Sequence, residues 1–64
     1  MVRTFYVVVE KRPRSVWLNI YYDKNHKDRY LFDVFDSMDE AISYTKDRLK
    51  GDKLFLTIKG RIAA

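Results

Sequence analysis

Residues 29–50, RYLFDVFDSMDEAISYTKDRLK, contain the point at which the hydrophobic period changes from that of a strand to that of a helix. Residues 29–35 are rich in aromatic and β-branched side chains, which favour a strand. Ser37 followed by Glu40 is a capping-box pattern that begins a helix. Apolar or small side chains then recur at helical spacing: Met38, Ala41, Ile42, Thr45 and Leu49. The sequence predicts a strand followed by a helix over about residues 38–50.

Two more β-rich runs precede this stretch, at residues 3–10 (RTFYVVVE) and 16–23 (VWLNIYYD). The segment KRPRS at residues 11–15 separates them, and Pro13 cannot belong to a central strand because proline lacks a backbone N–H. The polar cluster KNHKD at residues 24–28 has the composition of a turn. The first half of the chain therefore predicts a hairpin that continues into the strand at the start of the quoted stretch.

The residues after the helix predict one more strand. Gly51 suits the left-handed conformation that follows a helix C-terminus, and residues 53–59 (KLFLTIK) alternate as a strand. We therefore predict an α+β fold in the order β-β-β-α-β, with a three-stranded antiparallel sheet, one helix packed on one face and a C-terminal strand. Residues 1–64 are expected to form a single α+β domain, because a chain of this length has room for one core.

The composition favours a soluble cytoplasmic protein with no membrane partner. The chain has no cysteine, which excludes disulfides and favours a reducing compartment, and no apolar run approaches the roughly 18 residues of a membrane span. The net charge is +4, and residues 1–30 hold seven Lys or Arg against three Asp or Glu. A basic first half favours polyanionic partners such as nucleic acid.

The residues that could support catalysis are few. His26 is the one histidine and lies in a charged predicted turn, where a solvated residue is the simplest interpretation. Gly51 and Gly60 are the two glycines, so no glycine-rich phosphate loop exists. We expect that the protein is not an enzyme and that it has no cofactor and no metal site.

Strand side chains alternate between two faces, and one helix can cover only one of them. The set expected in the core is Phe5, Val7, Val9, Val16, Leu18, Ile20, Tyr22, Tyr30, Phe32, Val34, Leu54, Leu56 and Ile58. The set expected on the other face is Tyr6, Trp17, Tyr21, Leu31 and Phe55. An uncovered apolar face of this kind favours a binding platform or a homodimer interface. Two alternatives stay open: the chain covers this face itself, or the third strand has the opposite register.

Cations and aromatic rings alternate along the first half of the chain, in a pattern that nucleic-acid-binding proteins use for phosphate contacts and base stacking. The residues predicted to bind nucleic acid are Lys11, Arg12, Arg14, Trp17, Asn19, Tyr21, Lys24, Lys27 and Arg29. Glu10, Asp23 and Asp33 fall on the same predicted face and would repel phosphates. For the cations around Pro13, the alternative is a solvated turn that is polar for solubility.

These residues carry two resemblances. Trp17 in mid-strand, the helix start FDSMDEA at residues 35–41 and the closing Gly60-Arg61-Ile62 resemble a family of short bacterial and phage proteins of unknown function. Residues 16–49 are similar, through Trp17, Tyr21 and residues 35–41, to the three-stranded-sheet-plus-helix DNA-binding domains of tyrosine integrase N-termini and plant AP2 factors. In those domains the sheet reads the major groove. The resemblance implies that these residues lie near DNA: Arg14, Trp17, Asn19, Arg29 and Leu31.

We therefore expect a small basic nucleic-acid-binding protein, with DNA favoured over RNA, such as a virus- or plasmid-encoded accessory or regulatory factor. The alternative is a protein-interaction module or inhibitor that binds a protein partner, or a second copy as a homodimer, through the face of Tyr6, Trp17, Tyr21 and Phe55. The two functions differ in their salt dependence, because phosphate contacts make affinity fall steeply as salt rises.

Overall fold

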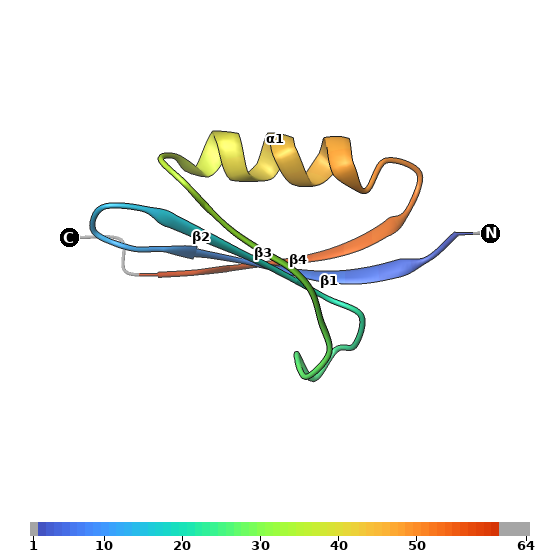
Figure 1. The fold of residues 1–64 in the computed structure, drawn as a ribbon. Coiled ribbons are helices and arrows are strands. Elements are labelled where there is room, and N and C mark those ends of the chain that lie inside the picture. The colour runs from blue at the N-terminus through green and yellow to red at the C-terminus, as the bar shows by residue number, and fades with distance from the viewer. Residues whose placement is uncertain (1, 61–64) are drawn as a thin grey trace.

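The computed structural model describes residues 2–60 of the chain. Its elements are β1 (Thr4–Lys11), β2 (Val16–Tyr21), β3 (Arg29–Phe35), α1 (Met38–Arg48) and β4 (Lys53–Lys59). The strands form one sheet in the order β3-β2-β1-β4, and α1 lies across one face of it (Figure 1). The predicted α+β class and the order β-β-β-α-β are confirmed.

The sheet is four-stranded and mixed, so the prediction of a three-stranded antiparallel sheet is wrong. β2 pairs antiparallel with β1 and with β3, whereas β4 pairs parallel with β1. The parallel pairing extends from Thr4 opposite Lys53 to Glu10 opposite Lys59. α1 brings the chain back from the end of β3 to the start of β1, and parallel pairing requires a crossover of this kind. β1 is therefore a central strand.

α1 begins at the predicted cap. Ser37 is the N-cap in an extended conformation, and its Oγ accepts a hydrogen bond from the N–H of Glu40 at 3.2 Å. The helix ends at Arg48, two residues before the predicted Lys50. Gly51 then takes the positive φ predicted for it, 90°, in the turn that leads to β4.

The core lies between α1 and the two central strands. Its buried side chains are Phe5, Val7, Val9, Val16, Leu18, Ile20, Ala41 and Leu49. The core predicted for the first two strands is thus confirmed except for Tyr22, which is 47% exposed. Leu56 and Ile58 of β4 share the helix side with Val7 and Val9, yet they are 51% and 56% exposed. The reason is that, within the described residues, α1 contacts β1, β2 and β3 but not β4.

The face of β3 that points toward α1 is the opposite of the one we predicted. Phe32 and Val34 were expected in the core, but they are 42% and 47% exposed on the side away from α1. Leu31 was expected on the exposed aromatic face, but it packs against the core. Of the predicted β3 core set, only Tyr30 packs there.

The pairing of β3 with β2 explains this correction. Leu31 lies opposite Ile20 and Asp33 opposite Leu18, so both residues lie on the helix side of the sheet. A register shift next to Ile20 leaves Tyr30 as an extra residue that also reaches the core. β3 is an edge strand, so the exposed side chain of Asp33 avoids the cost of burying a charge.

We predict that Leu18→Ala lowers the free energy of unfolding by about 2–4 kcal/mol, because Leu18 is fully buried and its truncation leaves a cavity. Ile42→Ala is the matched variant on the half-buried flank of α1 and should cost less. Urea unfolding of both variants measures the difference. A Leu18→Ala protein as stable as the parent would contradict the assignment of the core.

Candidate nucleic-acid interface

The sheet face away from α1, here called the open face, is covered by no helix in the described part of the chain (Figure 1). Its residues, by strand alternation and register, are Thr4, Tyr6, Val8, Glu10, Trp17, Asn19, Tyr21, Arg29, Phe32, Val34, Lys53, Phe55, Thr57 and Lys59. Tyr6 lies between Tyr21 and Phe55, and its ring stacks on that of Phe55 with centroids 5.1 Å apart. The predicted aromatic face therefore exists, with Phe32 and Val34 in place of Leu31.

Arg12 leaves the β1–β2 turn and lies back over the open face. Its guanidinium carbon is 4.1 Å from the ring centroid of Trp17, and its Nη2 is 3.0 Å from the carboxylate of Glu10. The Nε1–H of Trp17 donates a hydrogen bond to Ser15 Oγ at 3.1 Å. The indole is thus held at its edge by a hydroxyl and at one face by a cation, which orients it before any partner binds.

Arg29 and Lys53 place two more cations near rings of the open face. Arg29 lies 5.4 Å from the centroid of Phe32 and donates a hydrogen bond to Asn19 Oδ1 at 3.2 Å. The ammonium of Lys53 lies 5.2 Å from the centroid of Phe55. Each such contact contributes about 0.5–1 kcal/mol at an exposed site. Positive charge is therefore distributed among the rings of this face.

The β2–β3 loop, residues 22–28, curls to the side of the sheet opposite α1 (Figure 1). His26 has a positive φ of 59°, and its ring stacks on Tyr21 with centroids 4.7 Å apart. We predicted a solvated turn residue and missed this contact, because no sequence pattern marks a histidine in the left-handed region. Lys24 and Lys27 are exposed in the same loop, at one end of the open face.

Asp23 closes this loop with its carboxylate. Its Oδ1 accepts hydrogen bonds from the N–H of Asp28 at 2.9 Å and of Lys27 at 3.0 Å. These bonds, that of Asp28 first, lower the pKa of the Asp23 carboxyl below its ordinary value of 3.8, against a smaller opposing effect of desolvation. The ionised carboxylate thus fixes the backbone that carries the loop lysines.

The carboxylates that we expected to repel phosphates are differently placed. Asp33 lies on the helix side of the sheet, and Asp23 is engaged by the backbone of its own loop. Glu10 is paired with Arg12. Of the sheet residues on the open face, only Glu10 is acidic. The negative charge anticipated on this surface is therefore largely removed or neutralised.

The residues predicted to bind nucleic acid fall into three groups. The open face holds Arg12, Trp17, Asn19, Tyr21 and Arg29. Lys11 and Arg14 lie at the β1–β2 end of the sheet, and Lys24 and Lys27 at the opposite end. Lys11 lies opposite the buried Val16, so its side chain starts on the helix side.

Phe32 and Lys53 belong to the open face, although we predicted neither as a binding residue. Phe32 was missed because residues 30, 32 and 34 form the fully apolar phase of this strand, so alternation assigned Phe32 to the core. Lys53 could have been found from the sequence, since it alternates with Phe55 in a strand whose other phase is entirely aliphatic.

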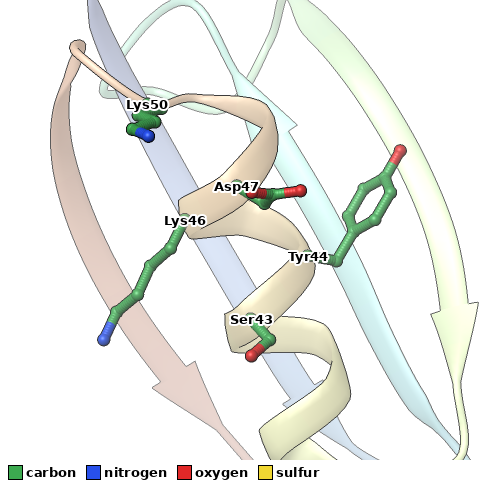
Figure 2. A pocket seen from close by; sticks show the side chains of 5 residues that line it. All are labelled: Ser43, Tyr44, Lys46, Asp47 and Lys50. Atoms are coloured by element: carbon green, nitrogen blue, oxygen red, sulfur yellow. The ribbon is translucent and has the colours of Figure 1, made fainter.

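A shallow depression lies on the other side of the molecule, along α1. It is lined by Ser43, Tyr44, Lys46, Asp47 and Lys50. Figure 2 shows Tyr44 pointing toward β3 and Lys46 pointing toward β4, so the two side chains diverge. An enzyme site needs polar groups that converge in a concave pocket. The depression holds none of the predicted binding residues and has no such convergence.

No group of three or more His, Cys, Asp or Glu side chains within the described residues 2–60 is placed to hold a metal ion. None of the helical structure in that range has both the length and the apolar character needed to span a membrane.

Comparison of the chain with family models, with curated proteins and with solved structures gives no match. The two resemblances carried by Trp17 and residues 35–41 therefore stay predictions. Gly60 lies at the end of the described chain, and the remainder of the closing Gly60-Arg61-Ile62 motif lies outside the described residues.

We predict that the β2–β3 loop loosens in acid solution, as the pH falls below 3.8 and through the lowered pKa of the Asp23 carboxyl. The folded pKa lies below the unfolded value of 3.8, so the stabilisation is present above the unfolded pKa and is lost in more acid solution. Amide hydrogen exchange at Lys27 and Asp28 measures it. Asp23→Asn should accelerate exchange at pH 7, whereas Asp28→Asn, which removes the same charge from the same loop, should have a smaller effect. Equal effects would contradict the role of the Asp23 carboxylate.

Proposed function

We propose that the protein is a small, non-enzymatic nucleic-acid-binding protein that holds a single strand across its open face, with DNA favoured over RNA. The observation that carries the proposal is the set of cations next to exposed or half-exposed rings, such as Arg12 over Trp17 and Arg29 over Phe32. Proteins that bind single strands combine aromatic platforms for bases with positive charge for the backbone. A stacked base contributes about 1–3 kcal/mol by this mechanism.

The length of β2 fits such a strand. Trp17 and Tyr21 lie four residues apart on one face of β2, which corresponds to about 13 Å of strand. Arg12 lies near the first ring, and the loop with Lys24 and Lys27 lies beyond the second. A short oligonucleotide that follows β2 would meet a ring and a cation at each end.

The contacts on the open face favour unpaired bases over a duplex. Reading a major groove requires polar side chains that are free to bond base edges. Asn19 and Arg29, the residues best suited to that task, are hydrogen-bonded to each other. Flat rings such as Trp17 stack on the faces of bases, and those faces are accessible only when the bases are unstacked.

A protein partner on the same face is the second candidate. Phe32 and Val34 on β3 are 42% and 47% exposed, and Phe55 at the other edge of the sheet is 45% exposed. Exposed apolar side chains of this size often mark a protein interface. A homodimer through the open face would bury these side chains together with Trp17. This candidate differs from the first in its weak dependence on salt.

We predict that the double variant Lys24→Ala, Lys27→Ala weakens binding to a single-stranded oligonucleotide and reduces the slope of log affinity against log salt by about 1.4. This value corresponds to two phosphate contacts at about 0.7 each on a single strand. Lys46→Ala, Lys50→Ala is the matched control, since it removes the same charge from the opposite side of the molecule. Fluorescence anisotropy at several salt concentrations measures both slopes.

The proposal fails if the parent protein binds no oligonucleotide at about 50 mM salt, where phosphate contacts are strong. It also fails if the control variant changes the slope as much as the loop variant does. A duplex that binds more tightly than its single strands would overturn the stacking role of Trp17 and favour groove recognition. Absence of binding together with a dimer in sedimentation would favour the protein-partner candidate.

A further inference from the structure

β4 is an edge strand with exposed apolar side chains on both of its sides. It pairs with β1 alone, through a regular register over all seven of its residues. Leu56 and Ile58 are 51% and 56% exposed on the helix side, and Phe55 is 45% exposed on the open face. The backbone groups of β4 that point away from β1 have no strand to pair with in the described part of the chain. Such an edge is a template for one more strand.

The opposite edge of the sheet, β3, has features that hinder the addition of another strand, and β4 lacks them. β3 has a register shift next to Ile20, and bulges of this kind hinder the addition of another strand. Asp33 places a charged side chain on β3, and its Oδ1 accepts a hydrogen bond from the N–H of Val34 at 2.7 Å. β4 has no register shift, no proline and no acidic residue.

The flank of α1 nearest to β4 is basic. Ile42 and Lys46 are spaced by four residues and therefore share one flank of the helix, and Lys50 follows in the turn after its end. The other flank contacts β3, where Tyr44 packs on Phe35 with ring centroids 5.2 Å apart. Figure 2 shows Lys46 pointing toward β4, away from Tyr44. An approaching strand would thus meet an apolar row on β4 and ammonium groups from the helix.

We propose that the free edge of β4 accepts an extended, acidic segment of a partner protein as a fifth strand of the sheet. Main-chain hydrogen bonds would supply affinity, and alternate apolar side chains of the segment would pack on Leu56 and Ile58. Carboxylates in the other positions would lie on the opposite side of the sheet, where they would meet the lysines at the two ends of β4, Lys53 and Lys59. The proposed site shares Lys53 and Lys59 with the open face, but Leu56 and Ile58 lie on the helix side, and the site does not require that nucleic acid binds to the open face.

The charges of β4 argue against a second copy of this chain as the added strand. In a symmetric antiparallel pair centred on Leu56, Lys53 of each copy would lie opposite Lys59 of the other. Like charges directly opposite each other on paired strands are destabilising. The two lysines therefore act against self-pairing and favour an acidic partner.

The test uses the full chain and a seven-residue peptide that alternates valine with glutamate, monitored by ¹⁵N NMR. Addition of the peptide should shift the amide resonances of β4. The double variant Leu56→Thr, Ile58→Thr should weaken the affinity for the peptide by about tenfold or more, which corresponds to about 1.4 kcal/mol. Lys53→Ala, Lys59→Ala should weaken peptide binding as well, because these lysines lie on the side of the sheet that the glutamates face, whereas Lys24→Ala, Lys27→Ala should not. Val34→Thr is the matched control, because Val34 is similarly exposed but lies on the other edge strand.

Three results would overturn the inference: saturation of the protein with peptide without shifts in β4, equal binding of a peptide with lysine in place of glutamate, or a dimer of the chain alone that the double variant at Leu56 and Ile58 dissolves. Oligonucleotide binding by the Leu56→Thr, Ile58→Thr variant should equal that of the parent. A failure at β4 is therefore distinguishable from a failure of the nucleic-acid proposal at the open face.

Discussion

A single helix of 11 residues has to cover a four-stranded sheet, and this limit shapes the rest of the molecule. At 1.5 Å per residue the helix is about 16 Å long, and it shields one side of the strands that it crosses. Its buried residues, Ala41, Thr45 and Leu49, lie on the side of α1 that faces the sheet. β1 and β2 consequently contain the core, while the open face and the β4 edge are left to solvent.

The uncovered surfaces are made compatible with water by cations more than by carboxylates. Arg12 and Arg29 lie over rings that would otherwise be bare, and the same guanidinium groups are available to phosphate oxygens. At β4 the lysines are placed at both ends of an apolar strand, so this edge combines solubility with a preference for acidic strands. One physical arrangement, cations beside apolar surface, thus supports both proposed interactions.

The sequence predicted the elements well because their local signals were unambiguous. The period change at Ser37, the turn around Pro13 and the positive φ of Gly51 each depend on neighbouring residues alone. The face of β3 was predicted wrongly, because its fully apolar phase, residues 30, 32 and 34, favoured the core side, whereas its pairing with β2 places Leu31 and Asp33 there. The exposure of Leu56 could not be predicted either, because alternation assigns a residue to one side of the sheet but does not show how far the helix extends over that side.

If the open face is accessible in the folded protein and binds an oligonucleotide, both properties can be followed at one residue. Trp17 is the only tryptophan of the chain and lies on that face, so acrylamide quenching of its fluorescence reports on this surface directly. Trp17 of the free protein should be readily quenched, and a saturating single-stranded oligonucleotide should protect it. A Trp17 that is shielded in the free monomer, or whose quenching is unchanged by a bound oligonucleotide, would show that the open face is not the binding surface.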